Sequence, residues 1–356
     1  MRKFLVASVC VIAVLPSLGS AQPLSAAGPY SVIKTARVGG DGAFDYVYAD
    51  SAGRRLYIPR RSTPAVVTVF DLDTLAPLGT IANTSARGAA VDPKSGHGFS
   101  SSKPVAMWDS KTLVPIKTID VQGGPDGILF DPFNSRVYIL SHSAPNATVI
   151  NAVDGTVVGT IDLGGQPEQA VTDGQGHIYI DLEDKSQIAA VDARTMKVTA
   201  HYDLGGKGGA PAGLAFDVKN HILFAACAEP TGSMVILNSD TGNILASLPI
   251  GAGVDGAVFN PVTMEAFSSQ RDGTLTVIKE NSPTSFVVEQ NVQTKAGAKT
   301  LTLDTKTNHI LLITADYAAA APPAPASAGA TPPPGGGRAA PRQMVPGSFS
   351  ILVVGK

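Results

Sequence analysis

Ionisable side chains recur at the points where successive repeats of this sequence are expected to begin. Six of the seven entry positions carry a charged residue, and the seventh is Ala212. Two further polar residues fall in loops that are expected on the same side of the molecule. A ring of mixed charge could orient a small polar ligand or contact a partner protein. The candidate ligand-binding residues are Asp45, Arg60, Arg87, Asp126, His142, Glu168, Asp255 and Lys299.

The same residues permit two other interpretations. In the first, they pair with one another and only solvate a water-filled channel. In the second, Asp126, Glu168 and Asp255 form the one carboxylate trio that could hold a divalent cation, with His142 as an acid, a base or a ligand. Basic residues at neighbouring entry positions would oppose a cation. We therefore expect no metal, no cofactor and no catalytic residue, and keep a lactonase-like hydrolase or lyase as the alternative.

The other histidines are expected far from this ring. His97, His177, His221 and His309 lie before or at the start of the second strand of a repeat, which places them on the opposite face. Equivalent positions in successive repeats are spread around an axis, so a zinc or haem site built from several histidines is not expected. Cys227 follows an apolar stretch and is expected to be a buried, inert thiol.

An internal repeat supplies the elements that position these residues. An acidic residue or Asn ends an apolar run seven times, at intervals of 42, 39, 42, 44, 43 and 44 residues. These positions are Asp50, Asp92, Asp131, Asp173, Asp217, Asn260 and Asp304. In the clearest unit, residues 124–161, four short β-branched runs are separated by turn residues. The pattern predicts an all-β, seven-bladed β-propeller with four antiparallel strands per blade.

The last repeat lacks one strand, and the beginning of the chain supplies a spare one. Residues 299–303, 309–313 and 348–354 give three strands, whereas residues 30–38 form an unpaired strand before the first repeat. Pairing the first strand with the last would close the ring and remove both exposed sheet edges. We therefore predict one domain over residues 22–356, with a disordered insertion rich in Ala, Pro and Gly at 318–347 on the face of the blade-to-blade loops.

The first residues predict export to the periplasm or the medium. Arg2 and Lys3 precede an apolar run over residues 4–15 and then a tract of small residues, the pattern of a signal peptide that ends at residue 21. The run is shorter than the ~20 residues of a membrane-spanning helix, so no membrane insertion is expected. After its removal, 25 basic residues (27 − 2) face 29 acidic ones, and no basic cluster indicates nucleic-acid binding. We expect a monomer.

Three short motifs occur at fixed places in the repeats. Residues 124–127 read Gly-Pro-Asp-Gly, residues 130–132 read Phe-Asp-Pro, and Tyr57, Tyr138 and Tyr179 each precede Ile in a second strand. These motifs resemble the repeat of the YVTN-type β-propeller family of exported bacterial proteins, although the four-residue motif of its name is not reproduced. The resemblance covers essentially all of the chain after residue 21. It implies a propeller in the envelope or medium, and it implies no reaction.

The expected function is binding. The repeats carry structural motifs, and no constellation of nucleophile, base and orienting group accompanies them. In a propeller, the blade-to-blade loops and the loops between second and third strands are free to vary while the strands must pack. We therefore expect an exported protein that binds a protein partner or a small polar envelope ligand at the channel mouth formed by these loops.

Overall fold

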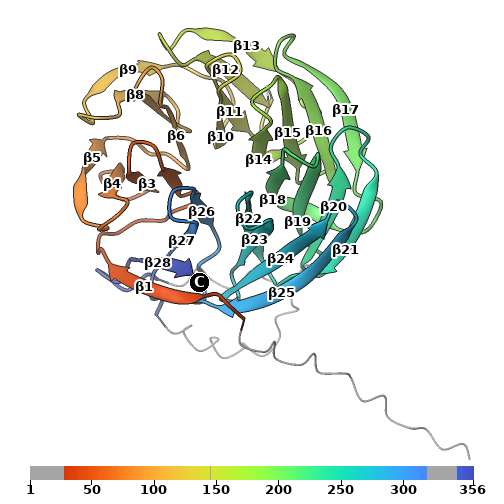
Figure 1. Ribbon diagram of the computed structural model, residues 1–356. Coiled ribbons are helices and arrows are strands. Elements are labelled where there is room, and N and C mark those ends of the chain that lie inside the picture. Colours follow the sequence, from red (N-terminus) through yellow and green to blue (C-terminus); the bar gives the residue numbers. More distant parts are fainter. Residues whose placement is uncertain (1–27, 145, 319–342) are drawn as a thin grey trace, which may run out of the picture.

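Seven four-stranded antiparallel sheets stand around a central axis in the computed structural model, which confirms the predicted seven-bladed β-propeller (Figure 1). The structure describes residues 28–144, 146–318 and 343–356. The predicted signal peptide, residues 1–21, lies outside the described residues. In six blades the strands follow one another from the axis outward in sequence order. Among the described residues there is no helix long and apolar enough to span a bilayer.

The strand bounds are as follows. Blade 1 contains β2 (Tyr48–Asp50), β3 (Arg55–Arg60), β4 (Val66–Asp71) and β5 (Pro77–Ala82). Blade 2 contains β6 (Ala89–Asp92), β7 (His97–Ser100), β8 (Val105–Asp109) and β9 (Pro115–Ile119). Blade 3 contains β10 (Pro125–Asp131), β11 (Arg136–Ser141), β12 (Ala147–Asn151) and β13 (Val157–Ile161). Blade 4 contains β14 (Pro167–Thr172), β15 (His177–Leu182), β16 (Gln187–Asp192) and β17 (Lys197–Asp203).

The remaining three blades complete the ring. Blade 5 contains β18 (Gly209–Asp217), β19 (Ile222–Glu229), β20 (Ser233–Asn238) and β21 (Ile244–Pro249). Blade 6 contains β22 (Val254–Asn260), β23 (Glu265–Gln270), β24 (Thr274–Ser282) and β25 (Ser285–Gln293). Blade 7 contains β26 (Leu301–Asp304), β27 (His309–Thr314), β28 (Ser350–Gly355) and β1 (Ser31–Arg37).

Blade 7 joins the two ends of the chain, as the missing strand predicts. Strand β1 pairs antiparallel with β28, so that Val32 lies opposite Val354 and Ala36 opposite Ile351. Just before β1, the backbone N–H of Tyr30 donates to Oε1 of Gln290 in blade 6 at 3.0 Å, and Nε2 of Gln290 donates back to the Tyr30 carbonyl at 2.8 Å. The first strand is therefore held by two blades.

The insertion leaves the propeller between β27 and β28, where the sequence places it. Its residues 319–342 lie outside the described residues. At its base, the Ala318 N–H donates to the Gln343 carbonyl and the Val345 N–H donates to the Asp316 carbonyl, both at 2.8 Å. Gln343 lines the same hollow as Gly42 of the loop that enters blade 1, so the base of the insertion lies on the face of the blade-to-blade loops.

The recurring acidic residue closes the turn between the first and second strands of a blade. In blade 2, Oδ1 of Asp92 accepts a bond from the Lys94 N–H at 2.9 Å, and in blade 1 Asp50 accepts from Gly53 at 2.8 Å. Both carboxylates are buried. Side-chain capping of a tight turn explains why an Asp or Asn recurs at this position.

Small residues let the innermost strands approach one another beside the channel. A Cβ atom added to Gly213 in β18 would lie 2.6 Å from the Gly256 carbonyl carbon of β22, and one added to Gly127 would lie 2.2 Å from the Glu168 carbonyl oxygen. Contacts this short with backbone atoms exclude even Ala. The entry residues are therefore fixed on closely packed strands that surround a narrow axis.

Candidate functional site

Most of the predicted entry residues meet at one end of the central channel, which we call the mouth. It is formed by the blade-to-blade loops and by the loops between second and third strands. Asp45, Arg87, Asp126, Glu168, Asp255 and Lys299 each come from a different blade entry. Blade 5 contributes Ala212 at this position, so the ring of charges is interrupted there.

Ion pairs connect five of these residues across the blades. Nζ of Lys299 lies 3.0 Å from Oδ1 of Asp45 and also contacts Asp255. Nη1 of Arg87 lies 2.9 Å from the other carboxylate oxygen of Asp45 and 3.1 Å from Oδ2 of Asp126. The carboxylates are largely withdrawn from solvent. Charges from blades 6, 7, 1, 2 and 3 are therefore linked in sequence around the mouth.

A second cluster continues this chain into blade 4. Nε2 of His142, in the loop after β11, lies 2.8 Å from Oε2 of Glu168 and 3.5 Å from Oδ2 of Asp126. The side chains of Asp126 and Glu168 are 3% and 12% exposed, whereas that of His142 is 35% exposed. The imidazole therefore lies between two buried carboxylates and is the part of the cluster that solvent reaches.

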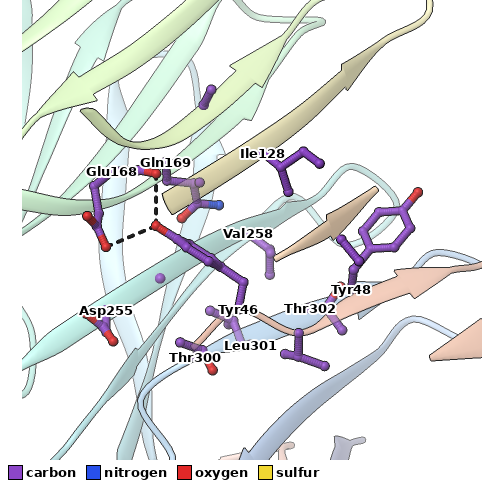
Figure 2. Close-up of a pocket in the computed structure, with 15 residues that line it drawn as sticks. Tyr46, Tyr48, Ile128, Glu168, Gln169, Asp255, Val258, Thr300, Leu301 and Thr302 are labelled. Atoms are coloured by element: carbon purple, nitrogen blue, oxygen red, sulfur yellow. Dashed lines mark hydrogen bonds between the residues drawn. The ribbon is translucent and has the colours of Figure 1, made fainter. Parts of the chain in front are cut away.

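Tyr46 and Gln169 extend into the channel next to the charged ring. Figure 2 shows the Tyr46 hydroxyl, which donates to Glu168 and lies 2.9 Å from its carbonyl oxygen and 3.0 Å from Oε1. Oε1 of Gln169 accepts bonds from the backbone N–H groups of Leu214 and Ala257 at 3.1 and 3.2 Å. A cavity of about 140 Å³ lies beside them. This volume suits a few water molecules or a ligand with few heavy atoms.

Burial and mutual contact shift the protonation of the cluster. Burial and the neighbouring Glu168 raise the pKa of Asp126 from 3.8 to about 7. The hydrogen bond to Glu168 raises the pKa of His142 above its ordinary value of 6.5. Burial lowers the pKa of Lys299, but the carboxylates of Asp255 and Asp45 raise it by more. The net shift is upward, so this residue stays charged. The Asp126 end of the mouth therefore takes up protons near neutral pH.

Arg60 is the predicted site residue that lies away from this network. It ends β3, and its guanidinium carbon is 3.5 Å from the centre of the Phe349 ring. Nη1 donates to the Gly39 carbonyl at 3.4 Å, and only 2% of the residue is exposed. Arg60 thus packs beneath the loop that enters blade 1. Its position at a strand end did not reveal that the side chain points inward.

The carboxylate trio considered from sequence does not converge. Within the described ranges, the one group of three potential metal ligands whose donor atoms lie within 4.8 Å of one another is Asp126, His142 and Glu168. Asp255 instead pairs with Lys299 and lies 3.5 Å from Nη2 of Arg271. In the structure, the histidine of the mouth therefore stands where the alternative trio would have its third carboxylate.

Sequence reasoning missed Tyr46 and Gln169, although a signal for them exists. The residue after the entry position is Gly in four blades, at 88, 127, 213 and 256. Tyr46, Gln169 and Thr300 replace it in the other three. A large side chain at a position where the repeat prefers Gly must point into the channel, since the neighbouring strands leave no other space. This departure from the repeat would have identified both residues.

Protonation of Asp126 predicts a stability that falls as pH rises. A pKa raised from 3.8 to about 7 on folding stabilises the folded state fully below pH 3.8, and this contribution is lost as pH rises through 7. One proton corresponds to at most ~1.36 kcal/mol per pH unit. We expect the Tm in metal-free buffer to fall between pH 5 and pH 8 by about 2 °C per pH unit. Asp126→Asn should reduce this slope, as measured by scanning calorimetry. Part of it remains, because burial also raises the pKa of Glu280 in blade 6 to about 7.

Asp154→Asn is the control for this measurement. Asp154 is exposed, and the backbone N–H of Thr156 lowers its pKa, so it titrates below the measured range. The slope of this variant should equal that of the unchanged protein. A slope in Asp126→Asn equal to that of the unchanged protein would show that Asp126 contributes nothing and that the pH dependence comes from other groups, such as Glu280.

Comparisons with known proteins agree on the architecture. No family model and no curated protein matches the sequence. A chain of the mitotic checkpoint complex is 12% identical with a TM-score of 0.67, covering 85% of this chain and 95% of that one. Hydrazine synthase from Kuenenia stuttgartiensis is 14% identical with a TM-score of 0.64, covering 84% and 96%. The WD40 repeats of RRP9 are 8% identical with a TM-score of 0.69, covering 92% and 99%. At these identities the similarity shows that the chain shares the β-propeller fold of WD40 repeats.

Proposed function

We propose that this chain is an exported β-propeller of the YVTN-repeat type that binds a protein partner or a small polar envelope ligand through its mouth, without catalysis of its own. The observation that carries the proposal is the chain of paired charges that links six of the seven blades around the mouth, from Asp255 in blade 6 to Glu168 in blade 4. Charged groups that are held by one another present a fixed pattern to a partner and need little reordering on binding.

The rim of the mouth favours a protein over a smaller ligand. Exposed charged residues of both signs surround the inner ring, from blades 1, 2, 4, 5 and 6: Arg61, Lys103, Asp184, Lys185, Glu229, Arg271 and Asp272. A polar, solvent-accessible rim is typical of protein interfaces, and exposed charges of both signs can pair with complementary charges of a partner. One structural neighbour belongs to the mitotic checkpoint complex, so the fold is compatible with assembly, whereas another belongs to an enzyme.

Two triple variants with equal charge change test this proposal. Arg61→Glu, Lys103→Glu and Lys185→Glu reverse exposed cations of the mouth rim, and the control reverses Lys94, Lys111 and Lys219, which are exposed on the opposite face. Each purified protein is immobilised and exposed to envelope extract and culture medium of the source cells at low and high salt. We expect a partner that the unchanged protein and the control capture and the rim variant loses.

The salt series provides an independent measurement. Binding steered by rim charges should weaken as ionic strength rises, because exposed charges are screened. Equal capture by both triple variants would contradict binding through the mouth. Absence of any captured protein, together with a thermal shift produced by lactones, sugars or organic acids, would favour a small ligand.

A further inference from the structure

We propose that Asp126, His142 and Glu168 form a binding site for a divalent first-row transition-metal ion of the zinc class. This site lies within the mouth and goes beyond partner binding, since it requires neither a partner nor the rim. It differs from the carboxylate trio considered from sequence by containing the imidazole nitrogen of His142 in place of Asp255.

The distances between the donor atoms match those of metal ligands. Zinc binds His nitrogen and carboxylate oxygen at about 2.0–2.2 Å, so two ligands of one ion lie roughly 3.0–3.5 Å apart. Nε2 of His142 lies 2.8 Å from Oε2 of Glu168 and 3.5 Å from Oδ2 of Asp126. All three donor atoms lie within 4.8 Å of one another, so the two carboxylates need only approach each other for one ion to contact all three.

The charge balance of the mouth leaves this end negative. Asp255 and Asp45 both contact Lys299, and Asp45 also contacts Arg87. In the part of the chain that the structure describes, Glu168 contacts no Lys or Arg within 4.0 Å, and its one basic neighbour is His142. Two buried carboxylates therefore share one bond to Arg87 and one imidazole. A divalent cation would compensate the remaining charge, which is costly to bury alone.

The surrounding contacts suit the ligating groups. Asp126 has two oxygens, so it can keep its contact with Nη1 of Arg87 through one while it binds an ion through the other. The Tyr46 hydroxyl donates to Oε1 of Glu168 and leaves Oε2 for the ion. Hydrogen bonds of this kind fix the orientation of ligating carboxylates.

The donor set also selects the kind of ion. Calcium and magnesium prefer six or more oxygen ligands, whereas imidazole favours zinc and its first-row neighbours. Three protein ligands leave a fourth position of a tetrahedral site open to water or to a donor atom of a bound molecule. The exposed edge of His142 gives an ion access from solvent. We therefore use Zn²⁺ as the probe.

Calorimetric titration of the mature protein tests the proposal. The protein carries no histidine tag, is stripped with EDTA and dialysed, and is titrated with ZnCl₂ and separately with CaCl₂. We expect one equivalent of Zn²⁺ to bind and CaCl₂ to give no comparable binding. Removal of a residue that only hydrogen-bonds to a metal ligand and orients it weakens metal binding about 10–100-fold. Removal of a ligand in His142→Gln should therefore weaken it at least ~100-fold.

His177→Gln is the matched control. His177 lies on the opposite face, and its Nδ1 lies 2.6 Å from a carboxylate oxygen of Asp173. Among the described residues, no second carboxylate contacts this imidazole. The zinc affinity of this variant should equal that of the unchanged protein. X-ray absorption of the zinc-loaded unchanged protein should show imidazole scattering from one histidine, which does not depend on the folding of any variant. Absence of a one-equivalent zinc site, equal weakening in both variants, or zinc with no imidazole ligand would overturn the proposal.

Discussion

A chain that begins at residue 38 is expected to lose its single cooperative unfolding transition and to form oligomers. This truncation removes β1 and Tyr30, and leaves β28, whose six residues are all buried, as an unpaired edge. Exposed apolar edges pair with other chains. Blade 7 would also lose its bonds to Gln290 of blade 6. Thermal unfolding followed by circular dichroism, with size-exclusion chromatography, measures both effects.

A chain that begins at residue 28 is the control. It keeps Tyr30 and all of β1, and is expected to unfold in one transition and to elute as a single species. If the chain that begins at residue 38 unfolded with the same midpoint, the closure of the ring would contribute nothing to stability. A synthetic peptide of residues 28–37 added to the truncated chain should restore the transition. Strand β1 is the outermost strand of blade 7 and pairs there with β28, so a separate peptide can occupy the same edge.

The fold could be predicted from the sequence because each blade repeats the same local signals. The count of strands predicts that residues 30–38 form the closing strand, and the structure places β1 at Ser31–Arg37. The number of strands does not predict the hydrogen bond from the Tyr30 hydroxyl to Glu265, which lies 235 residues away in the sequence. Such contacts depend on how neighbouring blades face each other, and no periodicity of the sequence reports this.

The site could be predicted only in part, for a physical reason. Entry residues reach the mouth because each occupies the same step of its repeat, so their location follows from the register. Their partners depend on side-chain length and direction. Lys299 is long enough to reach carboxylates of two neighbouring blades, so Asp255 pairs with it and not with the other two carboxylates of the alternative metal trio. His142, from the loop after β11, lies beside those two instead.

Lys299→Met should destabilise the protein more than any other single substitution in the mouth. Its side chain is 16% exposed, and its ammonium contacts Asp45 and Asp255, whose side chains are 9% and 12% exposed. Met keeps most of the side-chain volume and removes the charge, so two buried carboxylates lose their shared cation. Breaking a buried ion pair in this way costs about 3–5 kcal/mol. Urea unfolding at pH 7 measures the loss in the free energy of unfolding.

Lys295→Met separates this effect from a loss of charge in general. Lys295 lies in the same loop and pairs with Asp316, but the two side chains are 40% and 37% exposed. An exposed pair contributes about 0–1 kcal/mol and is screened by salt, whereas the loss in Lys299→Met should persist in 0.5 M NaCl. Adding Asp255→Asn to Lys299→Met should recover part of the lost stability, since it removes a buried carboxylate whose one remaining cationic contact in the described structure is the exposed Arg271. Equal losses in the two single variants would mean that water reaches the Lys299 pairs freely and that the ring of charges is not held rigidly.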